Sequence, residues 1–159
     1  MTQDLPTPDY AHKMKLIGYS DQGGRPDGVQ IMVNKGHAII GHMVSDGVSV
    51  VDCTDPRTPK AVAYVPAPPT TWNIHLQSHE DLRLVINAKN MFAAEEFQNE
   101  EEYYKGKLGK KVGTVNASRE RDWTAGVAVY DISNPAEPKK IGFMDVEGCG
   151  VHRLWYVGG

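Results

Sequence analysis

Hydrophobic and polar residues alternate along most of the chain with the period of two that is typical of β-strands. The stretches VQIMVNKGHAIIGHM (29–43) and IHLQSHEDLRLVINA (74–88) each contain an apolar run, a turn of polar residues or glycine, and a second apolar run. Val, Ile and Leu dominate these runs, and β-branched residues favour a pleated, half-buried surface. Each stretch is therefore predicted to form a β-hairpin, with NKGH and HEDL as the two turns.

The histidines His75 and His79 show why the choice between strand and helix matters. On a helix, a histidine pair four residues apart beside an acidic residue would indicate a metal site. On a strand, the two side chains point to the same side but lie about 13 Å apart, too far to bind one ion together. We therefore expect HEDL, which begins at His79, to be a solvent-exposed hairpin turn.

The chain also contains an internal repeat. GVSVVDCTDPRTPKAVAYVPA (47–67) and GVAVYDISNPAEPKKIGFMDV (126–146) align without a gap. In both copies a Gly-Val-x-Val-x-Asp run precedes a segment with two prolines, which excludes a helix and favours a tight polar turn. Because a predicted hairpin precedes each copy, one full unit is a four-stranded antiparallel meander of roughly forty residues, the size of a propeller blade.

Partial copies flank the two full units, since MKLIGYSD (14–21) matches KKIGFMDV and VHRLWYVGG (151–159) matches the start of the hairpins. We therefore predict an all-β fold in which 1–159 is part of one β-propeller domain and supplies about two and a half four-stranded antiparallel blades. The predicted parts are the outer strand of the closing blade (14–21), a blade (27–67), a second blade (71–146) and the inner strand of the next blade (148–159). A closed propeller typically has about four to eight blades, so we expect a second polypeptide, or the remainder of a cleaved precursor, to complete the ring.

The segment 91–123 is an insertion between the second and third strands of the second blade. Within it, AAEEFQNEEEYY combines strong helix formers with apolar residues, which predicts a short amphipathic helix, and the basic stretch KGKLGKKVG follows. A long insertion over one mouth of a propeller is typical of a lid or an interface. The alternative is a surface excursion without a role.

The signatures GVSVVDCTDPRTPKAV and GVAVYDISNPAEPKKIG resemble the LVIVD-repeat β-propeller proteins, whose blades carry a Gly-Val-x-Val-Val-Asp-x-Ser-x-Pro-x-x-Pro pattern. The resemblance covers most of 14–159 apart from the insertion. It implies a propeller of several blades and no single activity, because a fold does not define its chemistry.

Candidate metal ligands come from the repeat, because the first strand of each propeller blade lines the central channel. The alignment puts Gln30, His75 and His152 at equivalent positions of successive first strands, which converge on the channel axis. Neutral imidazole is a common ligand of transition metals. We therefore expect a transition metal ion (Fe, Cu, Zn or Mn) bound by His75 and His152, with Gln30 as a further candidate. The alternative is that these side chains only hydrogen-bond within the channel.

Two further residues are candidates for catalysis at the same mouth. Cys149 lies three residues before His152 between two glycines, so its thiol is a candidate nucleophile or ligand, or else a small buried side chain. Arg153 is a candidate for binding a substrate carboxylate, and the alternative is an ion pair on the strand surface.

Composition narrows the class of protein. The formal net charge is −3 with no long basic run, which argues against nucleic-acid binding through phosphate contacts. Two cysteines among 159 residues are too few for a disulfide scaffold. The N-terminus has no apolar core of a signal peptide, and no apolar run has the length of a membrane span. A cytoplasmic protein that does not bind membranes is expected.

These observations together predict a metal-dependent β-propeller enzyme that acts on a small organic substrate at the mouth of its channel. Because the candidate ligands are imidazoles, an oxidoreductase or oxygenase-like reaction is the first expectation. A hydrolase that uses Zn or Mn to activate water is an alternative. A non-catalytic interaction propeller that uses the 91–123 insertion is another.

Overall fold

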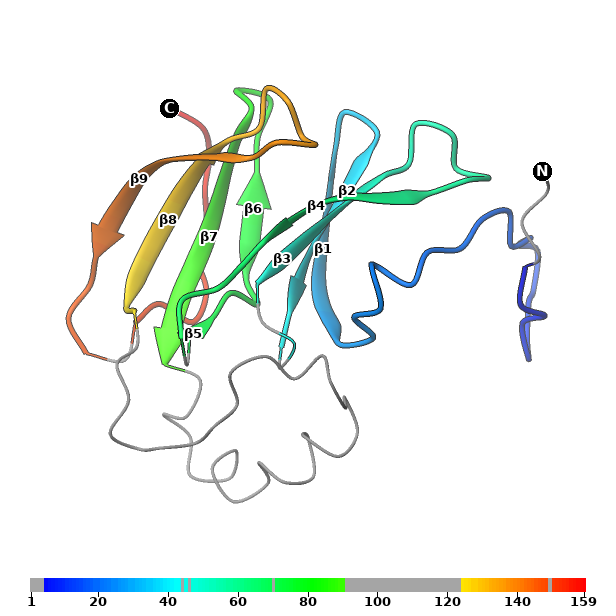
Figure 1. The fold of residues 1–159 in the computed structure, drawn as a ribbon, viewed down its shortest axis with the longest axis horizontal. Helices are drawn as coiled ribbons and strands as arrows, with labels where there is room; N and C mark the ends of the chain where they lie inside the picture. Colours follow the sequence, from blue (N-terminus) through cyan, green and yellow to red (C-terminus); the bar gives the residue numbers. More distant parts are fainter. Residues whose placement is uncertain (1–4, 44, 46, 70, 91–123, 149) are drawn as a thin grey trace, which may run out of the picture.

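A computed structural model describes residues 5–43, 45, 47–69, 71–90, 124–148 and 150–159 (Figure 1). The secondary structure of this part of the chain is β-strand, with no helix, so the prediction of an all-β fold is confirmed. The segment predicted to hold a helix, 91–123, lies outside the described residues, as does Cys149. No helix among the described residues is long and apolar enough to cross a membrane.

The first sheet is an antiparallel meander in which each strand pairs with the next one in sequence. Its order is β1 (Gly28–Asn34), β2 (His37–His42), β3 (Val48–Asp52) and β4 (Lys60–Val65). The NKGH turn between β1 and β2 has Lys35 and Gly36 at positive φ, 45° and 74°. Two successive residues at positive φ are typical of the tight hairpins that follow the twist of a sheet.

The second sheet repeats this meander, with its inner edge divided between two short strands. Its strands are β5 (Thr71–Trp72), β6 (Leu76–Ser78), β7 (Arg83–Asn90), β8 (Gly126–Asp131) and β9 (Lys139–Asp145). Both β5 and β6 pair with β7, and β8 and β9 follow in order. HEDL forms the turn between β6 and β7, with His79 and Glu80 exposed, as predicted.

The third and fourth strands of the two sheets pair in the same register, residue by residue, as the repeat between 47–67 and 126–146 predicted. Each third strand has an irregularity at the same place, between Val50 and Val51 in β3 and between Val129 and Tyr130 in β8. The turns that follow are also alike. Asp52 Oδ1 accepts a hydrogen bond from Thr54 N (2.9 Å), and Asp131 Oδ1 accepts one from Ser133 N (2.8 Å).

The glycine that starts each copy is required by its surroundings. Gly47 and Gly126 have positive φ, 66° and 154°. A Cβ on Gly47 would lie 2.2 Å from the carbonyl oxygen of Val65, and one on Gly126 would lie 2.1 Å from that of Met144. The repeat therefore keeps glycine at this position because the backbone of the neighbouring outer strand leaves no room for a side chain.

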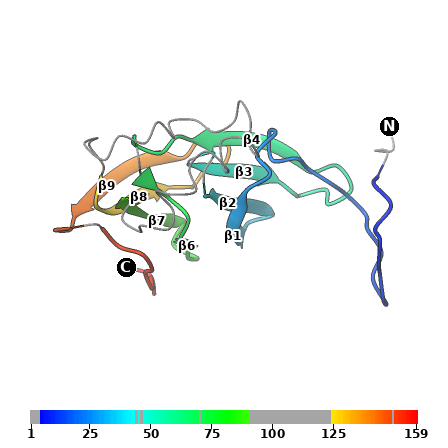
Figure 2. The same ribbon diagram turned by 90° about the horizontal axis from the view of Figure 1, so that it is seen from below.

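Among the described residues, one hydrophobic cluster joins the two sheets. It consists of residues from β2 and β3 on one side and from β6, β7 and the position just after β8 on the other: Ile39, Val48, Val50, Leu76, Leu84, Ile86 and Ile132. The inner strands β1 and β6 lie side by side (Figures 1 and 2), and Leu76 N donates to Gln30 Oε1 (3.0 Å). Figure 2 shows β1 and β6 on one side of the molecule and β4 and β9 on the other.

The predicted flanking strands differ from the two sheets. Residues 14–21 are not part of either sheet, and the strand expected to pair with them belongs to another blade, so that prediction is untested. Residues 150–159 run alongside β6 without forming a regular strand. Instead, Leu154 N donates to His75 Nδ1 (3.3 Å) and Tyr156 N donates to Gln77 Oε1 (2.7 Å).

Candidate ligand pocket at the ends of three inner segments

The residues predicted to converge line one pocket. Its volume is about 310 Å³, and three segments that are distant in sequence form it: the start of β1, the residues before β6, and the C-terminal segment. The lining residues are Val29, Gln30, Ile74, His75, His152 and Arg153. The structure therefore brings Gln30, His75, His152 and Arg153 together, whereas Cys149 lies outside the described residues.

The register of the sheets shows that Gln30 and His75 hold equivalent positions. Gln30 pairs with Gly41 on β2, and His75 faces Asn87 on β7, where the main chains exchange a hydrogen bond from Asn87 N to His75 O (2.9 Å). Each then accepts a hydrogen bond from the next inner segment. Gln30 accepts from Leu76 N, and His75 Nδ1 accepts from Leu154 N.

The same contacts identify the third member of the column. Leu76 directly follows His75, so the residue that directly precedes Leu154 is the counterpart of His75. That residue is Arg153. The sequence alignment had given this position to His152, one residue earlier in the chain. Both side chains line the pocket, because the C-terminal segment enters it without the regular alternation of a paired strand.

Asn87 holds the second and third walls of the pocket together. Its side chain is fully buried, and Oδ1 accepts from His75 N (2.8 Å) while Nδ2 donates to Val151 O (2.8 Å) and, at 3.4 Å, to His152 O. Sequence reasoning missed this residue. The available signal was an amide side chain inside the apolar run LVINA, where burial demands hydrogen-bond partners.

The electrostatics of the pocket favour a negatively charged ligand. The pKa of His75 lies below its usual value, first because burial disfavours the charged imidazolium and then because the positive charges of Arg153 and His152 are near. None of the described residues that line the pocket carries a carboxylate. At neutral pH the pocket therefore combines the cationic Arg153 with neutral hydrogen-bonding groups from Gln30 and His75.

The hydrogen bonds of His75 bear on metal binding. Its Nδ1 accepts from Leu154 N, so in the neutral ring Nε2 carries the proton and has no lone pair for a metal. Binding a metal through Nε2 would require the other tautomer and the loss of this hydrogen bond. Among the described residues, no group of three or more His, Cys, Asp or Glu side chains is arranged to hold a metal ion.

His79 lies at the opposite end of the inner strands, as the strand spacing predicted. It lines a separate pocket of about 470 Å³ with Lys35 and Glu80, among others. Its ring contacts Tyr156 edge-to-face, with centroids 6.2 Å apart. The hydroxyl of Tyr156 donates to Asp81, which lowers the pKa of that carboxyl.

Comparison with known proteins adds no identity. Neither a scan of protein-family models nor a search of curated proteins produced a match to this chain.

Proposed function

We propose that this chain forms consecutive blades of a β-propeller that binds a small anionic organic molecule, such as a carboxylate, at one mouth of its channel. The observation that carries the proposal is the pocket of about 310 Å³ lined by Gln30, His75, His152 and Arg153. A guanidinium binds a carboxylate through two parallel hydrogen bonds, and amide and imidazole groups can orient the rest of the molecule. The resemblance to LVIVD-repeat propellers agrees with this arrangement.

Exposed apolar residues support the idea that further blades pack against this chain. Ile31 on β1 and Leu76 on β6 are equivalent by register, since they pair with Ile40 and Ile86 respectively. Leu76 is fully buried between the two sheets, whereas Ile31 is 58% exposed. Ile31 thus presents the same face as Leu76, but on β1 the described residues leave it exposed, together with Val29 and Val33. We propose that a sheet with the same repeat, from this or another polypeptide, packs against this apolar stripe of β1.

Calorimetric titration of the full chain tests the anion site. Small mono- and dicarboxylates should bind, and their neutral amides should bind more weakly. Arg153→Ala should weaken carboxylate binding about ten- to a hundredfold, because a charge-assisted hydrogen bond contributes roughly 1.5–3 kcal/mol. Lys35→Ala is the matched control, since it removes a cation from the pocket at the other end of the strands. Equal binding of carboxylates and amides, or equal effects of the two variants, would reject the proposal.

A metal-dependent reaction is a second candidate function, because two imidazoles line the same pocket. It would need a transition metal held by His75 and His152, which would supply redox chemistry or an activated water. The hydrogen bond from Leu154 N to His75 Nδ1 argues against this use of His75 in the arrangement described. Elemental analysis of the intact protein tests the candidate: a stoichiometric transition metal, lost in His75→Gln, would favour it over simple anion binding.

A further inference from the structure

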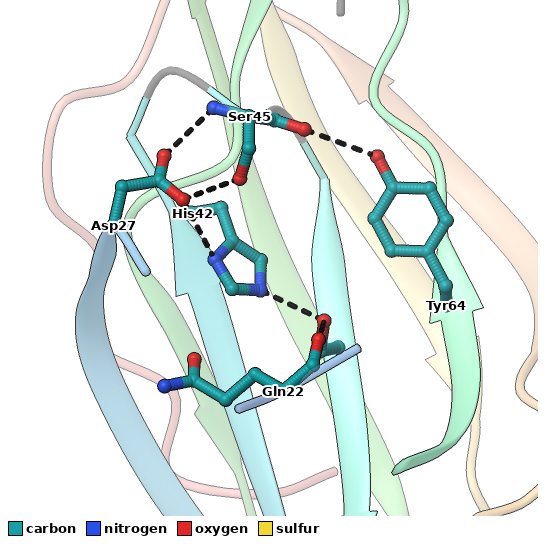
Figure 3. Close-up of polar contacts among 6 residues, drawn as sticks. Gln22, Asp27, His42, Ser45 and Tyr64 are labelled. Atoms are coloured by element: carbon teal, nitrogen blue, oxygen red, sulfur yellow. Dashed lines mark hydrogen bonds and ion pairs between the residues drawn. The ribbon is translucent and has the colours of Figure 1, made fainter. Parts of the chain in front are cut away.

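A buried polar cluster lies on the face of the first sheet that points away from the second sheet. His42, at the end of β2, is fully buried. Its Nε2 lies 2.8 Å from Ser49 Oγ on β3, and its Nδ1 lies 3.3 Å from Asp27 Oδ1 just before β1 (Figure 3). The imidazole therefore lies between a hydroxyl and a carboxylate, the arrangement that activates a serine as a nucleophile.

The surroundings of Asp27 define the direction of the hydrogen bonds. Asp27 Oδ2 accepts from Ser45 N (2.7 Å), and Oδ1 accepts from the Ser45 hydroxyl. A carboxylate that already accepts these bonds offers only acceptors to the imidazole. The tautomer of His42 with a proton on Nδ1 faces Asp27 favourably. Its Nε2 lone pair, 2.8 Å from Ser49 Oγ, then accepts the hydroxyl proton, and the competing acceptor, the carbonyl oxygen of Gln22, lies farther away at 3.4 Å. The contact to Asp27 is not aligned as a hydrogen bond, so its effect on His42 is electrostatic.

The strands of the repeat do not need this cluster. By the register of the two sheets, His42 and Ser49 correspond to Ala88 and Ala128, which pack in the second sheet as small apolar residues. The second sheet thus builds the same strands without an imidazole or a hydroxyl at these positions. Burying His42 and Ser49 costs desolvation energy, and the repeat does not require them. Their presence in the first sheet therefore needs another explanation.

A pocket reaches the serine. Its volume is about 270 Å³, and Ser49 lines it together with residues 22, 23 and 25 and residues 61–64 of β4. The Arg25 guanidinium carbon lies 3.6 Å from the centroid of the Tyr64 ring, while the Arg25 Nε is buried without a hydrogen-bond partner in the described part of the chain. Because Arg25 lines this pocket, its positive charge suits an anionic group on a ligand.

We propose that Asp27, His42 and Ser49 form a second, hydrolytic site for small esters that carry a carboxylate, which Arg25 binds. Ser49 Oγ attacks the ester carbonyl carbon and forms a C–O bond as its proton passes to His42 Nε2. The bond between the carbonyl carbon and the leaving alkoxide oxygen then breaks, and this oxygen takes the proton from the His42 imidazolium. The carboxylate of Asp27 stabilises the imidazolium while it exists. Water then attacks the acyl group by the same proton route and releases the acid and free Ser49.

Covalent labelling tests the site directly. The full chain is treated with diisopropyl fluorophosphate, which phosphorylates an activated serine and releases fluoride, and the modified peptide is identified by mass spectrometry. Labelling at Ser49 that disappears in His42→Ala is expected. The repeat predicts that His42→Ala and Ser49→Ala still fold, since alanine occupies both equivalent positions, and circular dichroism checks this. Unlabelled Ser49 in the folded wild-type chain, or labelling that persists in His42→Ala, would overturn the proposal.

Hydrolysis of 4-nitrophenyl hemisuccinate and of the neutral 4-nitrophenyl acetate tests the substrate class. Ser49→Ala should remove the activity toward both esters. Arg25→Gln should lower kcat/KM for the hemisuccinate about tenfold or more with little change for the acetate, because only the hemisuccinate has a carboxylate to lose its partner. Arg57→Gln, which changes an exposed cation in the turn between β3 and β4, should leave both rates unchanged. Hydrolysis that survives Ser49→Ala would show that the cluster only anchors residues 20–27 on the sheet.

Discussion

The replacement Asn87→Ala is the sharpest test of how the candidate ligand pocket is built. It removes the side-chain hydrogen bonds to His75 N (2.8 Å) and Val151 O (2.8 Å), together with the longer one to His152 O (3.4 Å). Asn87 itself is fully buried, so water cannot replace the amide without opening the structure. The backbone bonds of residue 87 remain, so the loss is confined to the groups that the amide satisfied.

The expected loss of stability follows from the two groups that lose their hydrogen-bond partner, His75 N and Val151 O. An unsatisfied buried donor or acceptor costs about 1–3 kcal/mol, with the low end suiting groups that are only half-buried, as His75 and Val151 are. Two such groups give a loss of about 2–4 kcal/mol in the free energy of unfolding. Because the same bonds hold the C-terminal segment against β6, carboxylate affinity should also fall.

Urea denaturation monitored by circular dichroism measures the stability, and calorimetric titration measures the affinity. Asn134→Ala is the control, since Asn134 is exposed in the turn after β8 and its side chain accepts one exposed hydrogen bond, from Ala136 N at 3.3 Å. Its loss should change stability by less than about 1 kcal/mol. A value for Asn87→Ala within that same range would refute the reasoning that Asn87 connects the walls of the pocket.

Three other predictions concern the repeat and the pocket. Leu76→Ala should lower the free energy of unfolding by about 2–5 kcal/mol. Ile31→Ala, at the equivalent but exposed position, should lower it by less than about 1 kcal/mol in this chain. Equal losses in urea denaturation would contradict this difference in burial between the two equivalent positions. Gly47→Ala should cost about 1–3 kcal/mol more than Gly148→Ala, because both have positive φ but only Gly47 has a backbone oxygen where the Cβ would lie; thermal unfolding compares them. The pKa of His75 is lowered on folding, so the unfolded chain binds more protons than the folded chain. The free energy of unfolding should therefore fall as the pH drops through 6.5 toward the lowered pKa. If His75→Gln shows the same decline in a pH series, His75 is not its cause.

The strands and turns could be predicted from the sequence because their causes are local. Alternation with a period of two identifies which residues share a face, and Gly and Pro mark where a strand must end. The gapless repeat added one long-range fact, that 47–67 and 126–146 adopt the same structure, and the shared irregularity at Val50 and Val129 bears this out. His79 could be assigned to a turn for the same reason.

The tertiary structure decided which side chains meet. Asn87 contacts a segment more than sixty residues later in the chain, and no local pattern encodes that distance. The sequence alignment made His152 the counterpart of His75 in the repeat, but the hydrogen bond from Leu154 N to His75 gives that position to Arg153. A segment without strand pairing need not keep the register of the repeat. His42, Ser49 and Asp27 come from three different strands or their ends, so only the packing of the sheet joins them into one cluster. Sequence periodicity determines the face on which a residue lies, whereas partners across strands depend on the register and the packing of the whole fold.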